Sequence, residues 1–195
     1  NLPVAMIPNC AATRHVHFTL DGSGPAEMPV PNLDDWPKIT WEAGPNSRRV
    51  NLNTVTPEEV QSWQPGETVL LSGKMLTGRD AAHRRIRDLF AAGESLPEGV
   101  DLNGRFIYYV GPVDPVAGEV VGPAGPTTAT RMDGFTEMML SKTGLLGMVG
   151  KAERGPIAIE AIKNHKAVYL MAVGGAAYLV SKAIRASRVV AFADL

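Results

Sequence analysis

The sequence predicts an α/β protein in which short strands alternate with helices. Runs such as 106–110 and 168–173 are short, apolar and rich in aromatic or β-branched residues, which is typical of buried strands. Segments with helical periodicity lie between these runs, and turns containing glycine or proline separate them. Strands that are joined through helices pair in parallel. We therefore expect an α/β sheet with parallel pairs in the second half of the 195-residue chain.

The first expected helix follows a Pro-rich segment and precedes two short strands. Thr56 supplies an N-cap residue and Pro57 a favourable first helical position, which predicts a helix over 56–63. Apolar runs at 69–71 and 75–76 then lie on either side of a Ser-Gly-Lys turn. We expect a strand at each of these two runs.

A longer amphipathic helix is expected over 80–92. Ala82, Ile86 and Phe90 recur on one face of this segment, and arginine side chains take the opposite face. Gly93 then provides the residue type that most readily ends a helix.

The second half of the chain continues the alternation. The strand at 106–110 is followed by an unusually long Gly/Pro loop over 111–126. Further helices are expected over 127–141, 157–163 and 176–184, and further strands over 145–149, 168–173 and 189–192.

Composition excludes several classes of partner. The net charge is −1, from 19 basic and 20 acidic residues, so no broad positive field favours nucleic acid or an anionic membrane. No uninterrupted apolar run reaches the roughly 20 residues of a membrane-spanning helix. The N-terminus also lacks a basic region followed by an apolar stretch. We expect a soluble, cytoplasmic protein.

The first part of the chain reads as an extended, Pro-rich arm over 1–55, with a short strand at 16–20. Cys10, within this arm, is the sole cysteine, so the chain cannot form an internal disulfide or a complete multi-cysteine metal site by itself. His15 and His17 alternate nearby, but two histidines and one cysteine on such an arm make a poor zinc site.

Three basic residues stand where strands pass into helices. Arg79 follows the strand at 75–76, Arg131 lies one turn into the helix expected after the long loop, and Lys151 follows the strand at 145–149. Ligands of open α/β sheets gather at the carboxyl ends of strands, beside helix N-termini. Separated cations at such junctions favour a small ligand with two carboxylates, because arginine binds a carboxylate through a fork of two donors.

The segment that leads to Arg131 has features of an anion site. Gly125 permits a close approach, Pro126 favours a first helical turn, and Thr127 and Thr128 offer hydroxyl groups. Arg131 lies four residues after Thr127, so within a helix both side chains would share one face. The alternative is an ordinary N-cap followed by a surface arginine.

Each cation also has an alternative without a ligand. Arg79 could pair with Asp80 or Glu94, and Lys151 could pair with Glu153. The three cations would then be scattered surface groups of a non-catalytic domain that binds small anions or has a regulatory role. What favours a site is that all three stand at equivalent junctions.

Four segments together resemble a known family. Residues 77–83, 125–133 and 148–151 resemble, in order, the C-terminal region of class I fumarases and of the related tartrate dehydratase β subunits. Residues 9–14 resemble the family segment that carries the last of three cysteines holding a [4Fe-4S] cluster. The resemblance implies that Cys10 is a cluster ligand.

The resemblance also implies an architecture. It is a swivelling β/β/α domain, a mixed sheet with flanking helices, over 56–195, preceded by the arm over 1–55. The chain begins at Asn1 without methionine and ends at Leu195 just after an expected strand, so we expect a piece of a longer protein, truncated at its C-terminal end. An N-terminal cluster-binding domain of the same enzyme, in a homodimer, would be its partner. Alone, the chain should be inactive and should lack the cluster.

The implied reaction is the reversible addition of water to fumarate, which gives malate. By resemblance, Arg79, Arg131 and Thr128 contact the substrate, and Thr127 and Lys151 are catalytic, with Thr127 exchanging a proton at the substrate carbon. An isolated threonine is a poor base, so this role requires a nearby cation or a proton relay to the other domain. Tartrate dehydration is the rival reaction, with the same cations and an additional substrate hydroxyl.

Overall fold

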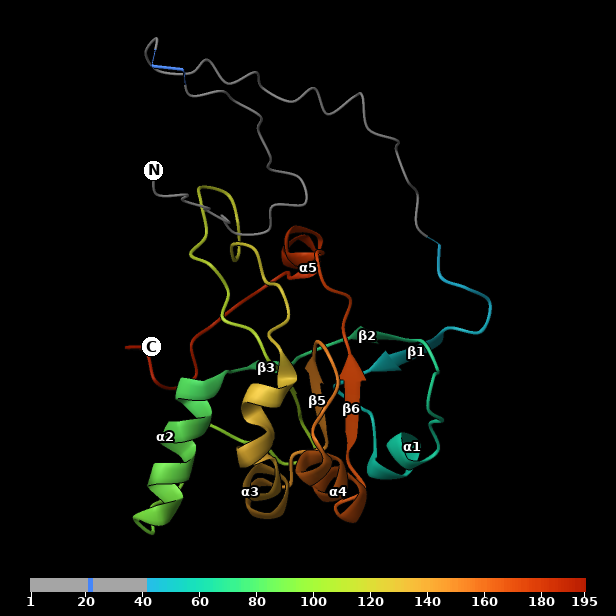
Figure 1. Cartoon of the computed structure of the whole chain (residues 1–195), viewed down its shortest axis with the longest axis vertical. Coiled ribbons are helices and arrows are strands. Elements are labelled where there is room, and N and C mark those ends of the chain that lie inside the picture. The colour runs from blue at the N-terminus through green and yellow to red at the C-terminus, as the bar shows by residue number, and fades with distance from the viewer. Residues whose placement is uncertain (1–20, 23–41) are drawn as a thin grey trace.

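The computed structural model describes residues 21–22 and 42–195 (Figure 1). The strands are β1 (Arg48–Asn51), β2 (Val69–Ser72), β3 (Leu76–Thr77), β4 (Phe106–Tyr108), β5 (Gly147–Gly150) and β6 (Val168–Met171). The helices are α1 (Pro57–Gln61), α2 (Asp80–Ala91), α3 (Asp133–Thr143), α4 (Pro156–Asn164) and α5 (Ala177–Ala183), with a 3-10 helix η3 (Ala129–Met132) directly before α3. No helix in these described ranges is long and apolar enough to cross a membrane.

The described strands form two parallel sheets. The larger has the order β3-β4-β5-β6, and the smaller pairs β1 with β2. The α/β class and the parallel pairs are confirmed, but the described sheets are parallel rather than mixed. The reason lies in the connections, because each step between neighbouring strands passes through a helix: α1, α2, α3 or α4.

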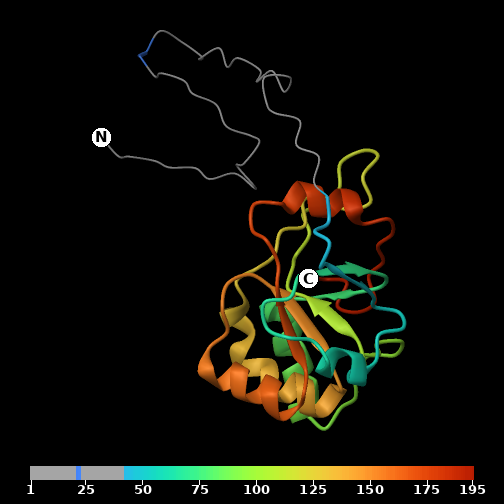
Figure 2. The same ribbon diagram turned by 90° about the vertical axis from the view of Figure 1, so that its right-hand side faces the viewer.

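The layers follow from the alternation of side chains along β4 and the residues after it. Ile107 and Tyr109 pack in the core beneath the helices, whereas Phe106, Tyr108 and Val110 pack toward the smaller sheet and α1. Figure 2 shows the helical layer on one side of the larger sheet and the β1-β2 pair on the other. This β-β-α layering agrees with the architecture implied by the resemblance. The swivelling motion stays a prediction.

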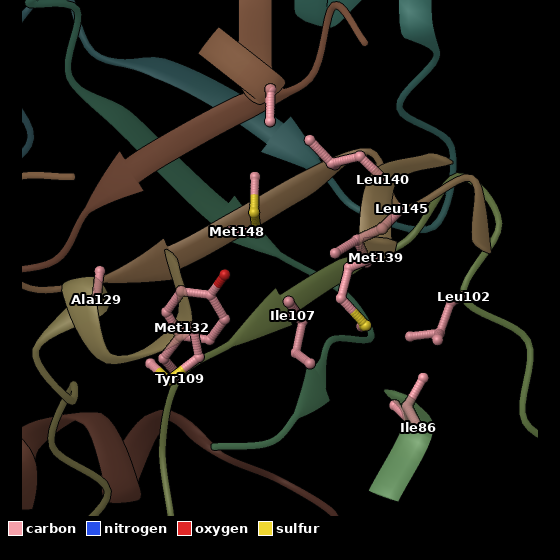
Figure 3. Close-up of a cluster of buried hydrophobic side chains, with 11 residues drawn as sticks. Ile86, Leu102, Ile107, Tyr109, Ala129, Met132, Met139, Leu140, Leu145 and Met148 are labelled. Atoms are coloured by element: carbon pink, nitrogen blue, oxygen red, sulfur yellow. The ribbon is translucent and has the colours of Figure 1, made fainter. Parts of the chain in front are cut away.

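The helix-side core joins the larger sheet to α2, η3, α3 and α4. Its buried members, labelled in Figure 3 except for Ala161, are Ile86, Leu102, Ile107, Tyr109, Ala129, Met132, Met139, Leu140, Leu145, Met148 and Ala161. Residues from the strand ends and from η3 are both part of this cluster, so the start of η3 is packed against the sheet.

The expected helix signals are found where the sequence puts them. The Thr56 hydroxyl accepts a hydrogen bond of 3.2 Å from the Glu59 N–H and caps α1. Gly93 and Gly144 have positive φ values of 75° and 68°, just after α2 and α3.

The helix expected over 127–141 begins later than predicted. The backbone of Thr127 is used in the sheet instead: its N–H donates to the Tyr109 carbonyl at 2.7 Å, and its carbonyl accepts from the Lys151 N–H at 3.1 Å. Helical structure therefore starts only with η3. The prediction that Thr127 and Arg131 share one helix face was wrong, because Thr127 is not in a helix.

The strand expected at 189–192 does not form. Val189 is 73% exposed, and Phe192 takes a left-handed φ of 54°. The Phe192 ring instead lies 5.4 Å from the Arg85 guanidinium of α2, and Arg85 also forms an ion pair with Asp194. The segment thus packs on α2 rather than extending a sheet.

The predicted division into an arm over 1–55 and a domain over 56–195 stays a prediction. β1 lies within the proposed arm, yet it pairs with β2, and Val50 and Leu52 are buried in the core on that side of the larger sheet. The compact part therefore includes β1. Cys10, His15, His17 and the strand expected at 16–20 lie outside the described residues.

A glycine in β5 gives a test of this packing. A Cβ on Gly147 would lie 2.2 Å from Phe106 Cε1, so we expect Gly147→Ala to lower the free energy of unfolding by about 1–3 kcal/mol. Gly134→Ala is the control, because nothing lies within 4 Å of its Cβ position in α3 and alanine favours the helix by about 0.5–1 kcal/mol. Urea denaturation measures both. Equal stabilities of the two variants would contradict the packing described here.

Candidate functional site

Three neighbouring strand ends bring the candidate residues to one edge of the larger sheet. β3, β4 and β5 are adjacent and parallel, so their carboxyl ends meet at the same edge. Backbone hydrogen bonds continue beyond the strands: the Gly78 N–H donates to the Tyr108 carbonyl at 3.2 Å. In Figure 1 the arrowheads of β5 and β6 point toward this edge, on the side where α5 lies.

Lys151 and the two threonines are held side by side through their backbones. The Lys151 N–H donates to the Thr127 carbonyl at 3.1 Å, and the Ala129 N–H donates to the Lys151 carbonyl at 2.9 Å. These bonds form a parallel bridge between Thr128 and Lys151. The 127–129 segment thus lies beside the end of β5 like a short added strand.

The close approach of this segment depends on Gly150. A Cβ at this position would lie 2.9 Å from Tyr109 Cδ2 and 3.3 Å from the Thr127 carbonyl oxygen. A larger residue would push Thr127 away from β5. The glycine beside Lys151 therefore has a packing role that brings two candidate site residues together.

Arg79 is at the N-cap position of α2, directly after β3. Its guanidinium lies against Gly111, in the loop after β4, where a Cβ would be 2.9 Å from Arg79 Cζ. Among the described residues Arg79 forms no ion pair, so the alternative pairings with Asp80 and Glu94 are not present. The Arg79 side chain is exposed and extends from β3 toward the neighbouring junction.

Arg131 has a carboxylate partner. Its Nε donates to Asp80 Oδ1 at 3.1 Å, and its Nη2 donates to Asp80 Oδ2. Asp80 is the first residue of α2, so the pair holds η3 against the start of α2, next to Arg79. The bidentate contact uses one edge of the guanidinium, and Nη1 remains available to a ligand.

The side chains of Thr127, Thr128 and Lys151 have no polar partner among the described residues. Neither Thr127 nor Thr128 has a hydrogen-bond partner for its hydroxyl among the described residues, and Thr128 makes no side-chain cap to η3. Lys151 is exposed and forms no ion pair with Glu153 or with any other carboxylate in the described part of the chain. This edge therefore carries two unpaired cations, one paired cation and two hydroxyls.

The edge is open rather than enclosed. Arg79, Arg131 and Lys151 are exposed, and the two threonines are half-buried. A separate shallow hollow, lined by residues such as Glu119 and Lys182, lies between the long loop and α5 and includes none of these side chains.

Arg154 is a buried residue of the site region that sequence reasoning missed. It follows Lys151 by three residues, and its Nε donates to Asp133 Oδ1 at 2.6 Å. Its guanidinium lies close to the rings of both Tyr109 and Tyr169. Burial raises the pKa of Tyr109 to about 12, although the Arg154 charge acts in the opposite direction. An arginine before a Gly-Pro helix start carries no sequence signal that predicts such burial.

The described residues do not by themselves fit an iron-sulfur cluster. They contain no cysteine, because the sole cysteine is Cys10, and in the part of the chain with described coordinates no group of three His, Cys, Asp or Glu side chains could hold a metal ion. The predicted role of Cys10 as a cluster ligand stays a prediction.

Comparison with known proteins identifies relatives along nearly the whole chain. A family model described as "Fumarase C-terminus" matches residues 22–195. Fumarate hydratase 2 of Leishmania major is 30% identical over 99% of this chain and 35% of its own length. The anaerobic class I fumarate hydratase of Escherichia coli is 31% identical over 99% of this chain and 36% of its own length.

A shorter relative is also similar. The putative L(+)-tartrate dehydratase subunit β of Methanocaldococcus jannaschii is 33% identical over 73% of this chain and 73% of its own length. The chain thus spans about a third of the length of the two fumarate hydratases, but most of this subunit.

The buried His83 contacts the backbone of Arg79. It is 1% exposed, its Nδ1 lies 2.8 Å from the Arg79 carbonyl oxygen, and its Nε2 has no partner among the described residues. A carbonyl only accepts, so Nδ1 carries the hydrogen of a neutral imidazole. Burial lowers the pKa of His83 below its usual 6.5.

This shift makes stability depend on pH. Below the usual pKa the unfolded chain takes up a proton at His83 that the folded chain refuses, so stability falls as pH is lowered from 6.5 toward the folded pKa. We expect the slope contributed by His83 to reach at most about 1.4 kcal/mol per pH unit. Urea titrations at several pH values should show a smaller slope in His83→Asn. Identical slopes would contradict a neutral, buried His83.

Proposed function

Because the chain belongs to the fumarase C-terminus family, we propose that it forms the substrate-holding part of a class I fumarate hydratase. This enzyme would catalyse the reversible hydration of fumarate to malate. The observation that carries the proposal is the gathering of Arg79, Lys151 and the Thr127 and Thr128 hydroxyls at one sheet edge, without partners among the described residues.

The charges at this edge suit a small dicarboxylate. Arg79 and Lys151 would each meet one carboxylate, and Arg131 would add a donor while Asp80 holds its other edge. Hydration adds a hydroxyl group to one carbon of the double bond and a proton to the next. The intermediate carries extra negative charge on a carboxylate, and fixed cations stabilise that charge more than they stabilise the substrate.

Thr127 is our candidate for the proton transfer at carbon, with Thr128 contacting the substrate. A threonine hydroxyl ionises only when a neighbouring positive charge stabilises the alkoxide. The hydrogen-bonded backbones of Thr127 and Lys151 favour Lys151 as the source of this charge. The alternative is a relay to a group outside this chain.

The activity would belong to an assembled enzyme in which this chain is joined to the further length that the fumarate hydratases have. We propose that this further part is an N-terminal cluster-binding domain, that the enzyme is a homodimer, and that Cys10 supplies one ligand of a [4Fe-4S] cluster. The cytoplasmic location expected from the sequence likewise stays a prediction.

Tartrate dehydration is the second candidate, and the similarity to a tartrate dehydratase β subunit favours it. Tartrate carries one hydroxyl more than malate, so its site needs an additional polar group, which Thr128 could provide. Initial rates of the assembled enzyme with fumarate, mesaconate and tartrate distinguish the candidates. A preference for tartrate would replace the fumarase proposal.

Arg131→Ala tests the carboxylate site. We expect it to lower kcat/KM of the assembled enzyme by about 100-fold or more, through loss of a charge-assisted contact. The matched control is Arg87→Ala, because the Arg87 and Arg131 side chains are both 52% exposed and both pair with an aspartate. Steady-state kinetics measures both variants. A near-normal kcat/KM for Arg131→Ala would remove Arg131 from the site.

Cys10 gives a separate test of the cluster. The 195-residue chain alone should show no hydratase activity and retain no cluster after anaerobic reconstitution. Cys10→Ser in the assembled enzyme should lower bound iron and sulfide, because one thiolate ligand is lost. Chemical analysis of iron and sulfide measures this. Unchanged cluster content in Cys10→Ser, or a stable cluster in the chain alone, would contradict the assignment.

A further inference from the structure

Arg154, in the loop between β5 and α4, is buried although it carries a full charge. Its side chain is 2% exposed. Removing a guanidinium from water is costly unless specific partners replace the water. Arg154 has such partners on several sides: Nε donates to Asp133, Nη2 donates to the Thr136 hydroxyl, and Nη1 lies 3.7 Å from Met148 Sδ.

Two tyrosine rings lie near the guanidinium, and one of them also bonds to the same loop. Arg154 Cζ lies 5.6 Å from the Tyr109 ring centroid and 5.1 Å from that of Tyr169. The Tyr169 hydroxyl donates to the Ala152 carbonyl at 2.7 Å. Ala152 has a left-handed φ of 63°, which alanine rarely adopts, so this turn depends on outside contacts.

Asp133 connects this loop to the helix that carries Arg131. One carboxylate oxygen accepts from Arg154, and the other accepts from the Gly155 N–H at 2.7 Å. Asp133 is the first residue of α3 and directly follows η3, which contains Arg131. The Arg154–Asp133 contact thus ties the turn after Lys151 to the turn that bears Arg131.

We propose that Arg154 is a positioning residue that fixes the Lys151 turn relative to the Arg131 turn. It touches no substrate; it sets the spacing between two cations of the site. The consequence for a dicarboxylate rests on the proposed function, whereas the fixing of the turn rests on the contacts of Arg154 alone.

An apolar side chain of similar length separates positioning from packing. Methionine at position 154 would fill much of the same space and avoid a buried charge, but it cannot bond to Asp133 or Thr136. If Arg154 were needed only for packing, this change would leave the turn as well ordered as before. If Arg154 fixes the turn, this change would loosen it.

The test is amide hydrogen exchange in Arg154→Met, followed by mass spectrometry or NMR. The amides of Ala129, Lys151 and Gly155 are hydrogen-bonded at this junction, and we expect them to exchange about 10-fold faster or more than in the wild type. Val50→Ala is the control, because it weakens the core on the other side of the sheet. It should leave these amides slow at matched global stability.

Arg154→Lys serves if the methionine variant does not fold. Lysine keeps the charge but loses the planar fork of donors. The same amides should therefore exchange faster than in Val50→Ala, but more slowly than in Arg154→Met. Exchange no faster than in the control, in whichever variant folds, would overturn the inference.

Kinetics of the assembled enzyme connects the turn to the site. We expect Arg154→Met to lower kcat/KM by about 10-fold or more, and Val50→Ala to leave it near the wild-type value. Unchanged kcat/KM in a variant with a loosened turn would overturn the role in the site. A wild-type enzyme that hydrates no dicarboxylate would refute the proposed function, while the exchange result would still decide whether Arg154 fixes the turn.

Discussion

The site region depends on one backbone interaction, the pairing of residues 127–129 with the chain at the carboxyl end of β5. Thr127 bonds through its N–H to the residue after β4 and through its carbonyl to Lys151, so the segment bridges two strand ends. This pairing places two hydroxyls next to a lysine and delays the helix until η3. Because η3 then packs on the sheet, Arg131 reaches the start of α2 and meets Asp80. Without this backbone pairing, these side chains would lie on separate loops.

Local signals explain how much of the fold could be predicted. The apolar stripe of Ala82, Ile86 and Phe90 specifies α2, and Thr56 with Pro57 specifies the start of α1, because each depends only on nearby residues. The start of the third helix could not be predicted in this way. The helix does not begin at Thr127 because the Thr127 backbone bonds to Tyr109 and Lys151, just after β4 and β5, and these bonds compete with helical bonds of the same backbone.

The placement of the cations could be predicted, but their partners could not. Arg79 and Lys151 stand directly after strands, and the topology of a parallel sheet alone brings such positions to one edge. The ion pair of Arg131 with Asp80 joins residues 51 positions apart, and that of Arg154 with Asp133 joins residues 21 apart. Nothing near Arg154 in the sequence distinguishes it from a surface arginine.

The contrast between buried and exposed charges suggests how such an edge can work. Arg154 is buried beneath the site and is bonded to Asp133 and Thr136. Arg79 and Lys151 lie in water, where leaving a cation unpaired costs little and where an attraction to a carboxylate is weak, about 1 kcal/mol at 4 Å in bulk water. Strong selectivity for a dicarboxylate therefore requires that water be displaced from this edge. A second surface that covers this edge would strengthen every contact there, while the contacts of Arg154 fix the spacing between the Lys151 and Arg131 turns.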